Sequence, residues 1–272
     1  MKVGITGCGW YGMPLARELA ACGYQVVGSK RDGAGCRALN DAGIEAVQLD
    51  LDDALLAPSL PLVDVDALII NIPPGLRRAE NDYLKRLARL KSLLLPNRLA
   101  RLIFISTTGV YPNMGLVSEE DARADNDSAA TLLKAEALFT EAPELLAPGG
   151  QVCVLRFAGL IGPGRHPGRF LAGRQDVPGA AQSVNLVHLV DCIAATRCLL
   201  TAADAAGIYN LCIPEHRSKQ AFYAEAASAL GLTAPQFNDV EMADKQIQAQ
   251  RICRQLGYVY RYPTLASALA DC

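Results

Sequence analysis

The chain has 272 residues, of which 51% are hydrophobic and 20% are charged, so it can bury a large core and is long for one compact unit. Its formal net charge of −2 and pI near 6.0 give no electrostatic case for a nucleic-acid or anionic-membrane partner. The sequence opens on a core strand and holds no uninterrupted apolar stretch of about 18 residues, so we expect a cytoplasmic protein.

The first predicted elements are a short apolar strand, a Gly-x-Gly-x-x-Gly turn at residues 7–12 and a helix over residues 13–22. In this order the spacing is typical of a dinucleotide site, although an ordinary glycine-rich connection can share it. The first glycine permits the tight turn, the second admits a pyrophosphate, and the third lets the helix approach the strand. The residues predicted to contact the dinucleotide are Gly7, Gly9, Trp10, Tyr11 and Gly12.

A second apolar strand, over residues 24–28, is followed by Ser29, Lys30 and Arg31. A site for NAD(H) places an acid near this point, to hold the ribose 2′-hydroxyl. A hydroxyl and two cations instead suit the 2′-phosphate of NADP(H), which arginine can bind bidentately. We therefore predict that all three residues bind NADP(H) rather than NAD(H). The alternatives are a solvated strand end and a ribose contact from Asp32.

Four later apolar runs predict further strands, and helical stretches such as residues 81–95 separate them. Because these runs are apolar on both faces, they indicate a parallel sheet covered on both sides. The predicted fold is α/β, a Rossmann-like doubly wound parallel sheet with a smaller C-terminal substrate-binding cap. Ligands of such a sheet bind at the carboxyl ends of its strands, so Asn71 is a further predicted cofactor contact. The four runs are residues 46–49, 67–72, 102–106 and 152–157.

The run over residues 102–106 ends in the hydroxyl-rich stretch Ser106-Thr107-Thr108-Gly109-Val110-Tyr111. This stretch resembles the strand-end motif of the extended short-chain dehydrogenases/reductases, the group of nucleotide-sugar epimerases and dehydratases. Residues 155–165, in which an arginine precedes Gly-Pro-Gly, resemble a segment of the group that leads to the substrate, and residues 185–191 resemble its return to the nucleotide domain. The resemblance spans roughly residues 1–211, and residues 254–263 are similar to the end of atypical members.

The resemblance implies roles for three residues of this stretch. Thr107 takes the position of the hydroxyl that hydrogen-bonds the reacting substrate oxygen, and Thr108 and Tyr111 are expected beside the substrate. The dehydratase branch is disfavoured, because Thr108 and Gly109 replace the Asp-Glu pair that elimination needs.

Two departures from the family pattern stand out. The glycine spacing is shorter than the usual Gly-x-x-Gly-x-x-Gly, which can still hold a pyrophosphate. More seriously, the catalytic Tyr-x-x-x-Lys aligns with Ala130 to Lys134, so the lysine is kept and the tyrosine is missing. The resemblance implies that Lys134 is a catalytic residue that binds the nicotinamide ribose; it can equally be a solvated helix lysine.

The missing phenol leaves three alternatives, because an alanine cannot move a proton. Another acid can replace it, although no spacing recommends one. The substrate can need no enzymic donor, as when an iminium or activated alkene takes hydride or a water relays through Thr107 and Thr108. Finally, catalysis can have been lost, which would leave a nucleotide sensor. The acids available as replacements are Tyr111, Tyr83, Tyr11 and His166.

The later part of the chain contains the expected substrate cap. The loop over residues 162–169 carries Arg165 and Arg169, which suit an anionic substrate group, although a solvated loop is as good an interpretation. Residues 218–231 have the apolar spacing of an amphipathic helix. We predict a dinucleotide-binding domain over residues 1–161 and 185–205, and a substrate domain over residues 162–184 and 206–272.

The nine cysteines are scattered and odd in number, without a Cys-x-x-Cys pair, which argues against disulfide frameworks and zinc sites. They are interpreted mostly as small core residues in a reducing compartment. Cys8 is an exception, because a thiol at a helix N-terminus can have a lowered pKa, but a filling role in the loop is preferred. No histidines and acids have metal-ligand spacing, so we expect no metal.

Together these patterns predict an NADP(H)-dependent oxidoreductase that acts on a carbonyl, hydroxyl or imine of a small or nucleotide-linked metabolite. The alternatives are a nucleotide-sugar epimerase-like enzyme and a non-catalytic NADP(H)-binding sensor. The expected partner is a small-molecule substrate, with no nucleic acid and no membrane, and the protein is expected to be a monomer or homodimer.

Overall fold

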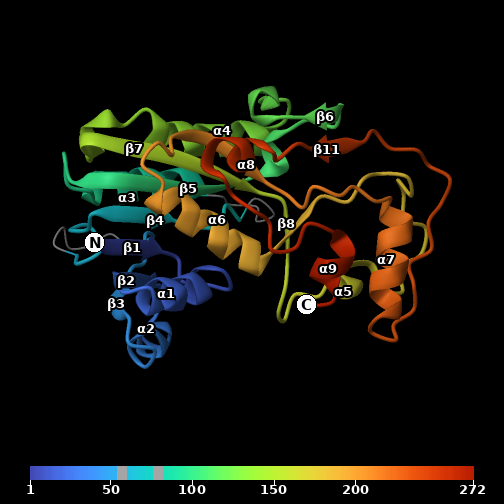
Figure 1. Cartoon of the computed structure of the whole chain (residues 1–272), viewed down its shortest axis with the longest axis horizontal. Helices are drawn as coiled ribbons and strands as arrows, with labels where there is room; N and C mark the ends of the chain where they lie inside the picture. The colour runs from blue at the N-terminus through green and yellow to red at the C-terminus, as the bar shows by residue number, and fades with distance from the viewer. Residues whose placement is uncertain (54–59, 76–81) are drawn as a thin grey trace. The chain divides into compact units, whose positions relative to one another are not determined.

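A seven-stranded sheet organises the fold, in the strand order β10-β7-β5-β4-β1-β2-β3 (Figure 1). The computed structural model describes residues 1–53, 60–75 and 82–272. The neighbouring pairs β1–β2, β2–β3, β1–β4 and β4–β5 are parallel, and the order reverses on either side of β1, which confirms the doubly wound α/β fold. The strands are β1 (Lys2–Thr6), β2 (Gln25–Lys30), β3 (Glu45–Gln48), β4 (Ala67–Ile70), β5 (Leu99–Thr107), β7 (Leu146–Phe157) and β10 (Gly207–Leu211).

The predicted elements match the observed ones closely in position. Each of the six predicted strands is present, whereas β10 was not predicted. The helix expected over residues 81–95 is shorter at both ends, and residue 81 lies outside the described residues. The helices are α1 (Gly12–Ala21), α2 (Gly33–Asn40), α3 (Tyr83–Leu93), α4 (Asp127–Thr140), α5 (Gly168–Leu171), α6 (Leu189–Thr201), α7 (Lys219–Ser228), α8 (Arg251–Leu256) and α9 (Leu265–Leu269).

The chain divides into two compact units. The first contains Met1–Ser106, Ala124–Leu155 and Thr196–Ile208, and the second contains Thr107–Arg123, Arg156–Ala195 and Tyr209–Cys272. The second unit therefore includes residues 107–123, 156–161 and 185–195, which the sequence placed in the dinucleotide domain.

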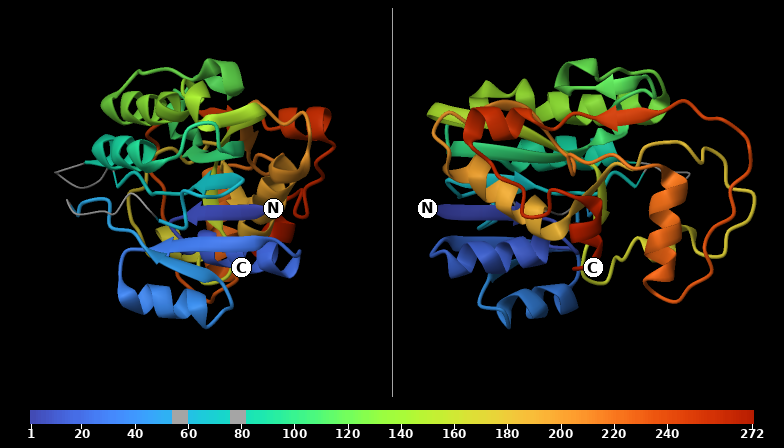
Figure 2. Two further views of the ribbon diagram at one scale, coloured as in Figure 1. Left: turned by 90° about the vertical axis from the view of Figure 1, so that its left-hand side faces the viewer. Right: turned by 45° about the vertical axis from the view of Figure 1, so that its right-hand side comes forward.

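The core of the first unit lies between the sheet and two helices. Apolar side chains of β4 and β5, such as Leu68 and Phe104, pack with Leu87 of α3 and Phe139 of α4. The rings of Phe104 and Phe139 stack with their centroids 5.4 Å apart. Figure 2 shows α3 and α4 on one side of the sheet and α1 on the other, so both faces are covered, as their apolar strands require.

The second unit has its own apolar core, built from β9 (Leu186–His188), α7 and α9 around the buried Phe222. It also holds two short parallel pairs, β8 with β9 and β6 with β11. The bounds of the remaining strands are β6 (Gly115–Val117), β8 (Gly159–Ile161) and β11 (Lys245–Ile247).

The described residues contain neither a candidate membrane span nor a candidate metal centre. None of their helices combines the length and the apolarity needed to cross a bilayer. Nor do they contain a group of three or more His, Cys, Asp or Glu residues arranged to hold a metal ion.

Candidate functional site

The glycine turn between β1 and α1 is held in place by the strands on either side. Gly7 has a φ of 81°, which favours glycine, and its N–H donates to Ser29 Oγ at 3.0 Å. The N–H of Cys8 donates to the carbonyl of Ser29 at 3.0 Å. Directly after β4, the side-chain amide of Asn71 donates to the carbonyl of Gly7 at 2.9 Å. Ser29 and Asn71, both predicted cofactor contacts, thus fix the loop.

The three glycines of the turn have different surroundings. A Cβ on Gly7 would lie 2.2 Å from the carbonyl oxygen of Asn71, and one on Gly12 would lie 2.5 Å from that of Gly7. These two glycines are required by the fold itself. Apart from its chain neighbours, a Cβ on Gly9 would meet no atom of the described residues within 4 Å, and Gly9 is exposed. Gly9 therefore leaves open space where a pyrophosphate would approach backbone N–H groups.

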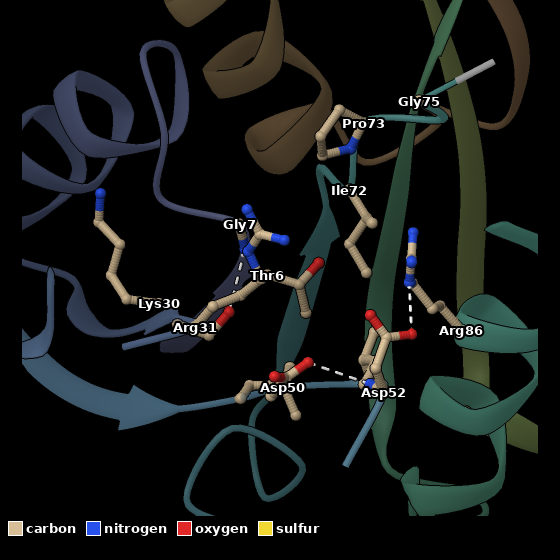
Figure 3. A pocket seen from close by; sticks show the side chains of 13 residues that line it. Thr6, Gly7, Lys30, Arg31, Asp50, Asp52, Ile72, Pro73, Gly75 and Arg86 are labelled. Carbon is tan, nitrogen blue, oxygen red and sulfur yellow. Dashed lines mark hydrogen bonds and ion pairs between the residues drawn. The ribbon is translucent and has the colours of Figure 1, made fainter. Parts of the chain in front are cut away.

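A pocket of about 270 Å³ opens beside this turn, at the carboxyl ends of β1, β2, β3 and β4 (Figure 3). Four predicted cofactor residues line it, Gly7, Ser29, Lys30 and Arg31. This is the edge of a doubly wound sheet where ligands bind. The other lining residues are Thr6, Leu49, Asp50, Leu51, Asp52, Ile72, Pro73, Gly75 and Arg86.

No sequence motif pointed to the acidic side of this pocket, which Asp50 and Asp52 form. Asp50 and Asp52 follow β3, and the rule that ligands bind at strand ends, applied to the predicted strand over residues 46–49, would have identified them. Arg86 comes from α3 and has no comparable signal; its Nε donates to Asp52 Oδ1 at 2.7 Å, so its charge is balanced there. Figure 3 shows this pair opposite the end of β2.

The positive charges of Lys30 and Arg31, at the end of β2, are not balanced in this way. Within the described part of the chain, Lys30 and Arg31 form no ion pair. The nearby Asp32 is the N-cap of α2, and its carboxylate accepts from the N–H of Gly35 at 2.7 Å. Asp32 is thus engaged in capping, which weakens the alternative that it binds a ribose. The Lys30 side chain lies against Gly35 and extends away from the other labelled side chains in Figure 3, which leaves Arg31 as the pocket's main cation.

Other residues of the turn point into the protein. The hydroxyl group of Tyr11 lies 2.6 Å from Thr196 Oγ1, and the Tyr11 side chain is 3% exposed. The predicted dinucleotide contact of Tyr11 is therefore limited to its backbone, and its phenol is not available as an acid. Trp10 is half-buried. Cys8 is fully buried, and burial raises the pKa of its thiol to about 11, which supports the filling role.

The helix α4 presents different residues to the sheet than the family alignment implied. Ser106 donates to Glu136 Oε1 at 2.5 Å, and Phe104 stacks on Phe139. Because the later strand residue contacts the earlier helix residue, α4 runs antiparallel to β5. The sheet-facing residue one turn before Glu136 is Leu132, and it lies toward the carboxyl end of β5. Leu132 is buried.

Lys134 lies on another face of α4. It is exposed and lines a surface groove with Leu84 and Ala88 of α3, and it does not line the pocket beside the glycine turn. Ala130, one turn earlier, lies on the same face. The geometry of the first unit therefore does not support the expected ribose contact of Lys134 or its catalytic role. The sheet-facing position carries a leucine instead.

From Thr107 on, the hydroxyl-rich stretch belongs to the second unit, and its two threonines differ in exposure and hydrogen bonding. Thr107 is partly exposed, and its Oγ1 accepts from the N–H of Gly109 at 3.2 Å, which orients the hydroxyl. Thr108 is buried, and its carbonyl accepts from Lys245 Nζ at 3.3 Å. Thr107 is thus better placed than Thr108 to meet a ligand.

Tyr111 is part of a buried network in the second unit. Its hydroxyl donates to Asn210 Oδ1 at 2.6 Å and accepts from Arg156 Nη1 at 2.7 Å. Arg156 is 1% exposed and also donates to the carbonyl of Glu119 at 3.0 Å. Burial is the main cause that raises the pKa of Tyr111 to about 12. The predicted substrate contact and the acid role of Tyr111 are therefore not supported, because the phenol holds the stretch in place.

The remaining candidates differ in availability. Tyr83 is buried, and burial raises its phenol pKa far above the ordinary value, so it is not a replacement acid. His166 accepts from the N–H of Gly168 at 3.0 Å, and burial and Arg169 lower its pKa. Arg165 and Arg169 are both exposed, so their predicted contact with an anionic substrate stays a prediction.

Comparisons with known proteins place these observations in context. No protein-family model matches the chain. Protein YeeZ of Escherichia coli strain K12 is 41% identical over 272 residues, with 96% of each chain covered. A UDP-glucuronic acid 4-epimerase from Bacillus cereus, solved with UDP-glucuronic acid and NAD, matches at a TM-score of 0.79 and 20% identity, covering 100% of this chain and 97% of that one.

A second solved structure has the same fold. A short-chain dehydrogenase/reductase superfamily protein from Agrobacterium tumefaciens, with bound NAD, has a TM-score of 0.79 and 18% identity, covering 100% of this chain and 95% of that one. At these identities the likeness concerns the fold, which is the fold that the sequence motifs implied.

Proposed function

Because this chain belongs to the family of the Escherichia coli protein YeeZ and has the fold of the extended short-chain dehydrogenases/reductases, we propose that it is an NADP(H)-dependent oxidoreductase. The substrate is a carbonyl, hydroxyl or imine compound of a small or nucleotide-linked metabolite. One observation carries the proposal: the open turn at Gly9 adjoins a pocket whose β2 edge carries Arg31 without an acidic partner among the described residues.

The residues of the pocket fit a nicotinamide dinucleotide, which the similar solved structures contain. Because Gly9 has no Cβ, the turn leaves space for a pyrophosphate beside its backbone N–H groups. The N-terminus of α1 adds a helix dipole that favours a negative charge there. Arg31 would hold the 2′-phosphate, and the apolar Leu51 and Ile72 would contact the adenine. When bound, the cofactor supplies or accepts a hydride.

We expect the substitution Arg31→Ala to remove a preference for NADPH over NADH. A charge-assisted bidentate contact to the 2′-phosphate is worth about 1.4 kcal/mol or more, so NADPH should bind about tenfold tighter than NADH to the parent protein. Calorimetric titration of both dinucleotides into the parent and the variant measures this. The variant Lys30→Ala is the matched control, because Lys30 points toward α2, and it should change the preference less.

Equal affinities of the parent for NADPH and NADH would contradict the assignment. In that case Asp50, the carboxylate that lines the same pocket, would be the better candidate for a ribose contact and NAD(H) the better cofactor.

For the reaction itself, we assign the hydroxyl of Thr107, which belongs to the second unit. Because Oγ1 accepts from the N–H of Gly109, the hydroxyl proton is directed away and can be donated to a substrate oxygen or nitrogen. A donor aimed at the atom where charge develops lowers the barrier to hydride transfer. With the phenols of Tyr11, Tyr83 and Tyr111 buried, a substrate that needs little proton transfer suits this chain best.

We expect Thr107→Val to lower turnover by about 2–3 kcal/mol, roughly thirty- to two-hundredfold, with NADPH affinity nearly unchanged. The conservative Thr107→Ser keeps the hydroxyl and should retain most of the activity. The assay follows the absorbance of NADPH with the parent protein against panels of ketones, imines and nucleotide sugars. A Thr107→Val enzyme as active as the parent would exclude this role.

A second candidate function is a non-catalytic NADP(H)-binding sensor. The observation that favours it is that α4 carries Ala130 where the family has its catalytic tyrosine, and that its sheet-facing residue Leu132 cannot move a proton. For this function we expect tight NADPH binding, no substrate that oxidises it, and a Thr107→Val variant identical to the parent.

A further inference from the structure

The second unit contains a pocket that no sequence motif pointed to. It has a volume of about 190 Å³, below the range of about 300–1,000 Å³ that drug-sized ligands occupy. Residues of α7, of the segment before β9 and of the start of β11 line it. The lining residues are Asn113, Gln182, Ser183, Val184, Asn185, Leu186, Lys219, Tyr223, Asp244 and Lys245.

Most polar groups of this pocket are occupied by the protein itself. Asn185 accepts from the N–H of Ile247 at 2.9 Å and donates to the carbonyl of Lys245 at 2.7 Å. Asp244 accepts from the N–H and the hydroxyl of Ser183, both at 2.7 Å. These bonds hold the pKa of Asp244 below its ordinary value, although burial alone would raise that pKa. The carboxylate is thus turned toward its own partners.

Lys219 differs, because its ammonium group has only neutral acceptors. Its Nζ lies 3.2 Å from the carbonyl of Pro178 and 3.4 Å from Gln182 Oε1, and no carboxylate among the described residues pairs with it. Burial lowers its pKa, as expected for a partly desolvated cation without a counter-ion. Tyr223 follows four residues later on α7, so both side chains lie on one face of the helix.

We propose that this pocket binds the oxyanion of a small metabolite, a carboxylate or a phosphate, through the ammonium of Lys219 and the hydroxyl of Tyr223. Both groups donate hydrogen bonds, and an anion would supply the missing counter-charge. The backbone N–H groups in the first turn of α7 already donate to Gln182, Ala180 and Ser218 and are not available to an anion. The contacts to the anion therefore come from side chains. The inference rests on the proposed function, because it assigns the pocket to the charged end of the substrate.

The test uses the full-length protein without dinucleotide, titrated calorimetrically with inorganic phosphate and with succinate at constant ionic strength, against sodium chloride. We expect saturable binding of one probe or both. Lys219→Gln should weaken binding at least about tenfold and Tyr223→Phe by a smaller factor of about three. Lys85→Gln, on α3 of the first unit, is the matched control and should leave binding unchanged. Binding of phosphate alone indicates a phosphorylated ligand, and binding of succinate alone indicates a carboxylate.

Phosphate also resembles the pyrophosphate expected at the glycine turn, so a second variant separates the two sites. Binding that survives Gly9→Val and is lost in Lys219→Gln belongs to the pocket of the second unit. Binding that is lost in Gly9→Val and kept in Lys219→Gln, or no binding of either probe, overturns the inference. NADPH titrations keep this result apart from the proposed function, because NADPH binding without anion binding overturns this inference alone.

Discussion

Gly9→Val is expected to abolish dinucleotide binding while leaving the free energy of unfolding almost unchanged. Beyond the two chain neighbours of Gly9, no atom of the described residues lies within 4 Å of a Cβ at this position, so we expect the new side chain to obstruct a bound pyrophosphate and not the fold. Losing the backbone approach should cost about 4 kcal/mol, roughly a thousandfold in Kd. Calorimetric titration with NADPH and NADH measures the affinity, and chemical denaturation measures the stability.

Gly12→Ala provides the matched comparison. Its Cβ would lie 2.5 Å from the carbonyl oxygen of Gly7, so this substitution distorts the turn and should lower both stability and affinity. A Gly9→Val protein that binds NADPH as tightly as the parent would show that the turn has another purpose. A Gly9→Val protein that is clearly destabilised would contradict the open geometry of the turn.

Asp191→Ala is expected to destabilise the second unit by about 3–5 kcal/mol, because it removes a buried carboxylate that has three hydrogen-bond donors. Asp191 is fully buried at the start of α6. Its Oδ1 accepts from the hydroxyl of Tyr258 at 2.6 Å and from the N–H of Arg261 at 2.7 Å, and its Oδ2 accepts from the N–H of Tyr262 at 3.1 Å. This one side chain fixes the C-terminal tail.

The size of the effect distinguishes this role from that of an ordinary helix acid. Tyr258→Phe removes one of the three hydrogen bonds and should lower the free energy of unfolding by about 1–2 kcal/mol. Burial and Asp191 raise the pKa of the Tyr258 phenol, so in the parent protein the phenol stays protonated and donates this bond. Asp239→Ala, at an exposed position, should be neutral. Chemical denaturation and limited proteolysis of the tail measure these changes. If Asp191→Ala costs no more than Asp239→Ala, the anchoring role is wrong.

The local elements and the glycine turn could be read from the sequence because they depend on short-range patterns. Runs that are apolar on both faces specify buried parallel strands whatever covers them. Gly7 and Gly12 are required by backbone approaches within one strand–turn–helix unit, so their spacing alone located the turn. The same holds for Ser29, which lies near the end of β2, and for Arg31, which follows that strand directly.

The tertiary structure decided which side chains are available for chemistry. Tyr111 has the right position in the motif, but Arg156 and Asn210, distant in sequence, occupy its hydroxyl. Lys134 has the right spacing from a family alignment, but the contact of Glu136 with Ser106 sets the rotation of α4 and turns Lys134 toward α3. Helix rotation depends on packing against a strand, which spacing in one sequence does not encode.

Contacts between residues far apart in the sequence likewise form both pockets. Arg86 reaches the pocket beside the glycine turn from α3 and pairs with Asp52, and the pocket of Lys219 and Tyr223 joins segments up to about 130 residues apart. The sequence by itself therefore determined the fold class, the glycine turn and the strand ends. Only the tertiary structure determined which polar groups are consumed by the protein and which remain for a ligand, because that depends on partners that the chain brings together by folding.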